Sequence, residues 1–466
     1  MWFIRNRIAI RNGYTFSDSV RWGCEQWATP DFGLRTCCPH LLATFRDLGC
    51  EVGRIFAVIV TCYFRMMQTL QTQTSFPPPS CDLQQMHKRK EVYKLADEVR
   101  AQLEIGGEEL IHQIGTRWRR LCAEVRSPPF YRPEWIAAWV RSFEPNSNLV
   151  LLTATAGDDL VAVLPMVRKK CFYAGVPVIK LIGTANSHSI HFDILRRTDV
   201  IGDLSLRAMW LLLSDTPGWH VLELPRFPEG GACKDLMALA ERDGCLTQMV
   251  LVQNSPVLRF RISGDGGPAT PVGGPSRHFR HELRRFARVL ASATGSTPTV
   301  RRCSDANPHL LNRFFELEQS GWKGREGSAI NCQPQTRSFY RQIAKAGADN
   351  GYFCLHSLEA NGAMAAGAFS IATRDGFFPM KIAHDESLRR GGPGHLLFKA
   401  IVAECAERQI PELFFGGTNE HYKTLWTQQT LPQFSALVFS QDFRSRVAYR
   451  VRKNILTPLG KLRRLV

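Results

Sequence analysis

Residues 389–408 read RRGGPGHLLFKAIVAECAER, and this stretch decides how the chain is interpreted. Three glycines and a proline at positions 391–394 stand directly before apolar residues at helical spacing. Glycine lets the backbone turn and lets a ligand approach it, and proline suits the first turn of a helix. A helix that begins there directs unpaired N–H groups and the positive end of its dipole outward, beside Arg389 and Arg390. The pattern predicts either a phosphate or pyrophosphate site or a plain turn before a surface helix.

Short apolar segments on both sides of this loop are typical of strands. Residues 351–358 and 363–372 predict two strands, because the Asn-Gly pair between them favours a tight hairpin turn. Residues 377–383 predict a third strand, and residues 410–417 predict another after the helix. The predicted order is three strands, the glycine-rich loop, a helix and a strand.

Five segments carry a resemblance to a known family: EQSGWKGREGSA at 318–329, FYR at 339–341, KIAHDE at 381–386, the glycine-rich loop, and YKTLW at 422–426. In this order and spacing they resemble the BioF2-like or CelD-like bacterial acetyltransferases of the GNAT superfamily of acyl-CoA N-acyltransferases. The sequence departs from the family pattern in two places. His384 stands where the family usually has tyrosine, and Asn419 and Glu420 stand where an acidic turn is usual.

The resemblance implies a donor, a reaction and an acceptor class. The donor is acetyl-CoA or another acyl-CoA, and the acceptor attacks the thioester directly, without a covalent enzyme intermediate. The acceptor is a polysaccharide or cell-envelope precursor. The residues expected to bind the cofactor are Arg389, Arg390, Gly391, Gly392, Gly394 and His395. No metal is expected.

Three residues are candidates for acid–base chemistry. A helix over residues 311–320 places Glu318 on its apolar side, where it serves either as general base or as an anchor for the following turn. Asp385 follows a strand and is a second candidate base, or else a turn residue. Tyr422 is the candidate that protonates the departing thiolate, as a tyrosine in this region often does in GNAT relatives, with simple packing as its other role.

Five further residues are candidates for binding the acceptor: Trp322, Lys323, Lys423, His191 and Asp193. Lys323 suits an acceptor carboxylate or phosphate, unless it is a surface lysine. His191 and Asp193 share one face of an extended segment, where a metal site lacks further ligands. We therefore expect them to form a wall of the acceptor cleft.

The order of predicted elements in residues 91–255 parallels that of the second half. This predicts tandem GNAT-like units, each with a mixed, mostly antiparallel central sheet flanked by helices. The expected division is an unassigned segment at 1–90, an acceptor-side unit at 91–255, the acetyltransferase unit at 256–440 and a basic, solvated tail at 441–466. The first segment is either poorly ordered or ahead of the true start of the protein.

The formal net charge of +17 over 466 residues favours polyanionic partners. Arginines recur on one face of a predicted helix at 277–288 and again in the tail, and either surface suits tRNA or acidic lipid, or is simply solvated. The 14 cysteines show no metal-binding spacing, and no apolar run is long enough to cross a membrane, so a cytoplasmic protein is expected. Two alternatives remain open: a Fem-like transferase that uses aminoacyl-tRNA, and a non-catalytic binding protein in exopolysaccharide or cellulose assembly.

Overall fold

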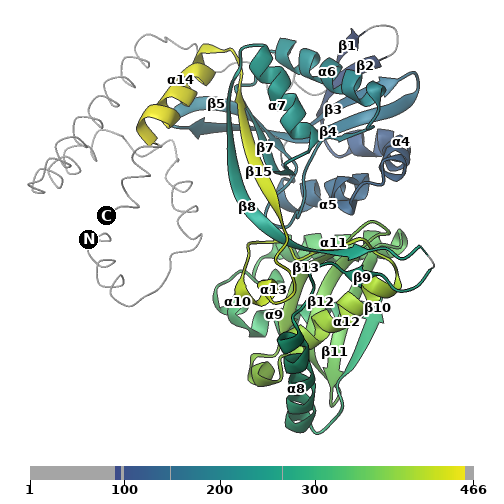
Figure 1. Cartoon of the computed structure of the whole chain (residues 1–466). Coiled ribbons are helices and arrows are strands. Elements are labelled where there is room, and N and C mark those ends of the chain that lie inside the picture. Colours follow the sequence, from purple (N-terminus) through teal and green to yellow (C-terminus); the bar gives the residue numbers. More distant parts are fainter. Residues whose placement is uncertain (1–89, 96–98, 147, 265, 457–466) are drawn as a thin grey trace, which may run out of the picture. The chain divides into compact units, whose positions relative to one another are not determined.

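The computed structural model describes residues 90–95, 99–146, 148–264 and 266–456 (Figure 1). The expectations for residues 1–89 and for the last part of the tail lie outside these ranges. Within them, no helix combines the length and the apolar character that a membrane span requires.

The first half follows a short strand, β1 (Lys90–Leu95), that pairs with β2. Its elements alternate in the predicted way between helices and strands. In chain order they are β2 (Val99–Gly106), α4 (Glu109–Glu124), η3 (Pro129–Tyr131), α5 (Pro133–Phe143), β3 (Asn148–Ala156), β4 (Asp159–Tyr173), β5 (Val176–Gly183), β6 (Leu195–Arg196), α6 (Val200–Asp215), β7 (Val221–Pro228), α7 (Ala232–Arg242) and β8 (Leu246–Arg261).

The second half repeats this order after β9 (Thr270–Pro271) and the basic helix α8 (Arg277–Thr294). Its elements are β10 (Thr299–Cys303), α9 (Pro308–Ser320), α10 (Trp322–Arg325), η4 (Ile330–Cys332), α11 (Pro334–Asp349), β11 (Phe353–Ala360), β12 (Ala363–Ala372), β13 (Phe377–His384), η5 (Glu386–Gly391), α12 (Pro393–Glu407), β14 (Glu412–Phe414), α13 (His421–Thr424) and β15 (Thr430–Phe439). The predicted fold class, a tandem mixed α/β arrangement, is confirmed.

The strands form one mostly antiparallel sheet in the order β1-β2-β3-β4-β5-β7-β15-β8-β14-β13-β12-β11-β10. Two neighbouring pairs are parallel, β5 with β7 and β13 with β14, and they occupy equivalent places in the two halves. The last strands are exchanged. β8, which ends the first half, pairs with β14, and β15, which ends the second, pairs with β7 (Figure 1). Because β8 and β15 also pair with each other, the exchange joins the two halves into a continuous sheet.

Aromatic side chains form a core that the two halves share. The Trp135 ring on α5 meets Phe339 on α11 edge to face, with 5.2 Å between centroids. Phe130 on η3 meets Phe378 on β13 in the same way at 5.1 Å. These four rings have at most 2 % of their surface exposed. Their burial couples the halves through apolar contact as well as through the sheet.

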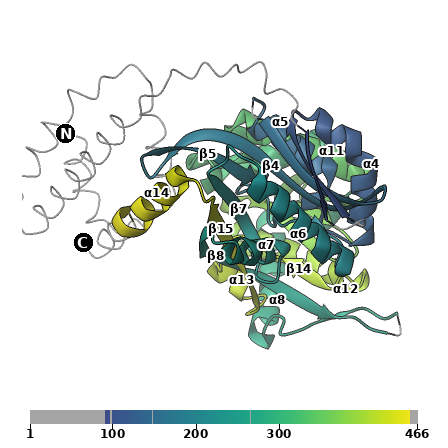
Figure 2. The ribbon, with the colours of Figure 1, turned by 90° about the horizontal axis from the view of Figure 1, so that it is seen from above.

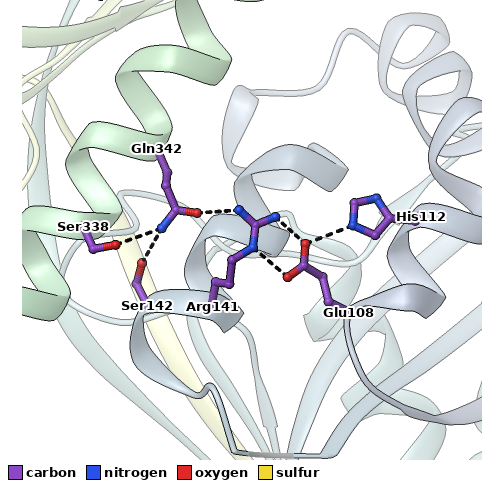
Figure 3. A network of polar contacts seen from close by, with 6 residues as sticks. All are labelled: Glu108, His112, Arg141, Ser142, Ser338 and Gln342. Carbon is purple, nitrogen blue, oxygen red and sulfur yellow. Dashed lines mark hydrogen bonds and ion pairs between the residues drawn. The ribbon is translucent and has the colours of Figure 1, made fainter. Parts of the chain in front are cut away.

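A polar network adds to the contact between α5 and α11 (Figure 3). Arg141 donates to Gln342 at 2.7 Å, and Gln342 donates to Ser142 at 3.1 Å. On its other side Arg141 forms a forked pair with Glu108, which lowers the pKa of that carboxyl group. A planar guanidinium with five donors can serve both partners at once, and this fixes how α5 lies against α11.

The basic segment expected as a solvated tail is in part a packed helix. α14 (Phe443–Val451) lies along β5 (Figure 2) and buries Ala448 and Val451. The Tyr449 ring stands edge-on to Phe439, with centroids 5.2 Å apart. The expectation overlooked that apolar residues recur between the arginines at helical spacing.

Candidate functional site

A cavity of about 530 Å³ lies where the two parallel strands of the second half separate. β13 and β14 pair through a single position, Phe377 opposite Leu413. Beyond it β13 continues to His384, while the chain after β14 turns away through residues 415–417. Both segments line the cavity, and residues 187–190 of the first half close another wall.

A bulge in β13 shapes this wall. Lys381 pairs with Phe369 and Pro379 with Ser370, so Met380 is an extra residue in the strand. The carbonyl of Ile382 does not face β12, because it accepts a hydrogen bond of 2.8 Å from the ammonium of Lys323. In an antiparallel strand the N–H and C=O of one residue point to the same edge. The N–H of Ile382 therefore faces the gap between β13 and β14.

The predicted glycine loop borders the same cavity, and its glycines are required for different reasons. Gly392 has φ +51°, and a Cβ atom there would lie 2.7 Å from the Phe286 ring. A Cβ on Gly391 would lie 2.9 Å from the Leu290 side chain. A Cβ on Gly394 would meet nothing closer than 3.8 Å, where it reaches His384 Nδ1. The first two glycines thus let α8 pack on the loop, and the third keeps the start of α12 open.

The predicted cofactor-binding residues lie together, with one exception. Arg389, Gly392, Gly394 and His395 line the cavity, Gly391 lies buried behind them, and Arg390 is exposed outside it. Trp426 donates to His395 Nδ1 at 3.3 Å, and the Phe286 ring stacks on the imidazole. Burial lowers the pKa of His395, so the ring is neutral near pH 7.

Glu318 is buried as predicted, but it does not line the cavity. Its carboxylate accepts from the backbone N–H of Ile330 at 2.8 Å and from Lys323 at 3.0 Å. Lys381 lies 3.9 Å from the same carboxylate. Glu318 therefore holds two cavity-lining lysines and the following loop, which matches the anchoring role that was the alternative to a general base.

Asp385 also departs from its predicted catalytic role. Its carboxylate accepts from the N–H and the hydroxyl of Ser387, at 2.9 and 2.7 Å, and so begins η5. It faces away from the cavity, which its neighbour His384 lines. Adjacent residues at a strand end point to opposite sides, so only one of the two could face the site. Burial lowers the pKa of His384, which leaves the imidazole neutral at pH 7.

Tyr422 and Trp322 line the cavity as predicted. Desolvation, with a smaller contribution from Glu420, raises the pKa of Tyr422 and keeps its hydroxyl protonated. Lys423 also borders the cavity, but its ammonium donates to the carbonyls of Gly416 and Thr418, at 2.6 and 3.1 Å. These bonds and an ion pair with Glu420 shape the chain after β14, and its binding of substrate stays a prediction.

His191 and Asp193 do not form the predicted cleft wall. The His191 ring packs against Phe130, Phe378 and Phe414, and burial lowers its pKa to about 4. Asp193 accepts from the first two N–H groups of α7, at 2.9 and 2.7 Å, and so caps that helix. The polar residues of this segment were interpreted as a cleft wall because the prediction did not consider that Asp193 could cap a helix.

Sequence reasoning missed four cavity residues: His188, Arg226, Lys381 and His384. None of the four was among the candidate residues, and His384 was noted only as a departure from the family pattern. Lys381 and His384 stand within the quoted KIAHDE motif, but strand alternation places residues three apart on opposite faces, so it could not have identified both. Arg226 had no local signal, because a backbone irregularity in β7 directs it. No cluster of His, Cys, Asp or Glu suited to a metal occurs in the described part of the chain.

Residues 277–424 match the acetyltransferase (GNAT) domain family, and this range includes the glycine loop and most of the cavity. No curated protein matches the chain. Solved structures similar to it include the C-terminal domain of a putative lysylphosphatidylglycerol synthetase from Agrobacterium fabrum, with 10 % identity, 73 % of this chain and 95 % of that chain covered and a TM-score of 0.44. FemX has 11 % identity, 72 % and 97 % coverage and a TM-score of 0.44. A tandem GNAT protein from the clavulanic acid biosynthesis pathway has 15 % identity, 75 % and 98 % coverage and a TM-score of 0.36.

Proposed function

We propose that this chain is an acyltransferase that moves an acyl group from acyl-CoA to an amine or hydroxyl held in the cavity. The observation that carries the proposal is that the glycine loop and the start of α12 border the gap between β13 and β14. A pyrophosphate at this end of α12 would accept a hydrogen bond from the Gly394 N–H and lie beside Arg389. The pantetheine arm would then follow the gap, with the thioester next to β13.

Three groups would act on the reacting atoms. The N–H of Ile382, directed into the gap, would polarise the thioester carbonyl and stabilise the oxyanion formed by the attack. Neutral His384 would take the proton from the attacking nitrogen or oxygen. The carbon–sulfur bond then breaks, the thiolate leaves, and the protonated hydroxyl of Tyr422 would donate a hydrogen bond to it. No covalent enzyme intermediate is needed.

The donor is proposed to be acetyl-CoA and the acceptor a polysaccharide or cell-envelope precursor, as the CelD-like motifs imply. His384 in place of the usual tyrosine bears on the acceptor side, because this residue lines the cavity. Acyl-CoA is a cytosolic metabolite, so the proposed reaction takes place in the cytoplasm.

One observation favours a second candidate, transfer from an aminoacyl-tRNA. α8 exposes Arg277, Arg280, Arg284 and Arg288, while its apolar side packs on the glycine loop. An exposed arginine face beside the donor site suits a polynucleotide backbone. Binding of tRNA that weakens steeply with salt and is lost in the Arg280→Gln/Arg284→Gln double variant would favour this candidate over acyl-CoA.

Calorimetric titration with CoA tests the leading proposal through position 394. Space exists for a side chain there, and a carboxylate at the start of a helix does not oppose the helix dipole, so Gly394→Glu should fold. Its charge should repel the pyrophosphate and weaken CoA binding by about tenfold or more, equivalent to ~1.4 kcal/mol. Gly394→Gln is the matched control, because it has the same shape without the charge. Equal CoA affinity in the two variants, or no CoA binding by the unaltered chain, would overturn the proposal.

A further inference from the structure

The cavity has an unbalanced charge. Its lining includes five basic side chains and no aspartate or glutamate; the basic residues are Arg226, Lys323, Lys381, Arg389 and Lys423. Lys423 is balanced by an ion pair with Glu420 and donates to two carbonyls after β14, and Arg389 borders the glycine loop, where the donor pyrophosphate is proposed to bind. A second carboxylate outside the lining, that of Glu318, lies 3.0 Å from Lys323 and 3.9 Å from Lys381. A single negative charge shared by two ammonium groups leaves this wall positive.

Arg226 reaches the cavity through an irregular backbone. Phe227 pairs with Phe434 and Leu224 with Ala436, so the two intervening residues of β7 face one residue of β15, Ser435. Arg226 has φ +50°, and its N–H donates to the Ser435 hydroxyl at 3.0 Å. A residue other than glycine is strained in this backbone region, and bulges of this kind re-aim side chains next to functional sites.

Arg226 and Lys381 act on the same neighbour. His188 lines the cavity between the aromatic core and the solvent side, with the Tyr340 hydroxyl 3.4 Å from its Nδ1. Burial, together with the smaller effect of the positive charges of Lys381 and Arg226, lowers the pKa of His188 to about 3. The three side chains come from a loop, from β7 and from β13, and the fold brings them to one part of the wall. A neutral imidazole there adds a hydrogen-bonding group without a negative charge.

We infer that the acceptor carries an anionic group, a phosphate or a carboxylate, and that Arg226 and Lys381 bind it at this wall. The inference rests on the proposed function, because it names the substrate class of the same cavity. The guanidinium offers a fork of two N–H donors that matches both anions, and the ammonium supplies a second charge. Because the glycine loop is a different wall, the acceptor anion and the donor pyrophosphate occupy separate subsites.

Titration of inorganic phosphate and of acetate into the CoA-saturated protein tests this subsite, because bound CoA fills the donor side. We expect saturable binding of one anion, seen as a rise in melting temperature, and a dissociation constant about tenfold higher in Arg226→Gln and in Lys381→Gln. Binding of phosphate alone identifies a phosphorylated acceptor, and binding of acetate alone identifies a carboxylate. Arg337→Gln is the control, since Arg337 is exposed and not part of the lining.

CoA affinity separates failure of this inference from failure of the proposed function. Variants that keep normal CoA binding are folded, so loss of anion binding in them reports on the subsite. If neither anion saturates, or if both variants bind as the unaltered chain does, the subsite is wrong while the acyltransferase proposal stands. If CoA itself does not bind, phosphate and acetate can be titrated into Gly394→Glu instead. The added carboxylate repels anions from the donor side, so saturable binding in this variant still reports on the acceptor subsite.

Discussion

The ammonium of Lys323 lies 3.0 Å from the carboxylate of Glu318, a residue with only 2 % of its surface exposed. The buried carboxylate thereby holds the Lys323 ammonium at the wall of the cavity. There Lys323 also donates to the Ile382 carbonyl. Glu318 is thereby a positioning residue. It fixes the edge of β13 along which the thioester is proposed to lie.

The main effect of replacing Glu318 with glutamine should therefore be a loss of stability. The change removes the negative charge between Lys323 and Lys381, and breaking a buried pair costs about 3 kcal/mol. Urea unfolding measures this, with Glu316→Gln as the control, because Glu316 is exposed on the same helix. A variant with unchanged stability and no turnover would instead identify Glu318 as the general base.

The glycine loop should tolerate side chains at one position and reject them at another. Gly392→Ala combines a left-handed backbone with a Cβ 2.7 Å from the Phe286 ring, and we expect it to lower stability by about 1–3 kcal/mol. Gly394→Ala has open space and should be close to neutral. Thermal melts of the two variants check the contrast, and equal melting temperatures would show that α8 does not pack on the loop as described.

Local signals predicted much of the second half. The hairpin turn was predicted correctly, since Asn361 and Gly362 both have positive φ. The glycine loop was placed correctly before α12, since proline and glycine act within one turn of chain. The exchange of β8 and β15 was not predicted, because strand pairing between residues far apart leaves no short-range pattern. The same limit applies to Arg226, whose direction depends on the register of β7 with β15.

The roles of buried polar residues were predicted less well, for a related reason. Glu318, Asp193 and Lys423 look reactive in sequence, yet each satisfies backbone groups in the structure. Buried polar groups need hydrogen-bond partners, and those partners become visible only when the chain is folded. Polar residues that line the cavity, such as His384, have the same chemical character in sequence and differ only in the side to which they point.

His191 should make the protein sensitive to acid. Its pKa is about 4 in the folded chain and has the ordinary value of 6.5 in the unfolded chain, so the unfolded chain binds more protons between these values. Its contribution to stability is complete above pH 6.5 and declines as the pH falls toward 4. At pH 5 the expected loss in the free energy of unfolding is about 2 kcal/mol. In His191→Leu the loss of stability between pH 7 and pH 5 should be smaller by that amount in urea unfolding. An unchanged pH dependence would contradict the burial of this ring.

Protonation of His384 should set the acidic limb of the pH profile of turnover. Its pKa lies below the usual 6.5 because of burial, so the neutral base is present at pH 7 and is lost only at lower pH. His384→Gln should lower turnover by about a hundredfold or more with little change in CoA affinity. The exposed neighbour His421 provides the control, as His421→Gln should retain turnover. If His384→Gln keeps both its turnover and the acidic limb of the pH profile, another group is the base.

A crystal structure of the chain with bound CoA would decide whether the glycine loop holds the donor. We expect the pyrophosphate at the start of α12, within hydrogen-bonding distance of the Gly394 N–H and the Arg389 side chain, and the thiol between β13 and the chain after β14, near Tyr422. CoA bound elsewhere, for example along the arginine face of α8, or a cavity that stays without CoA at saturating concentration, would contradict this expectation.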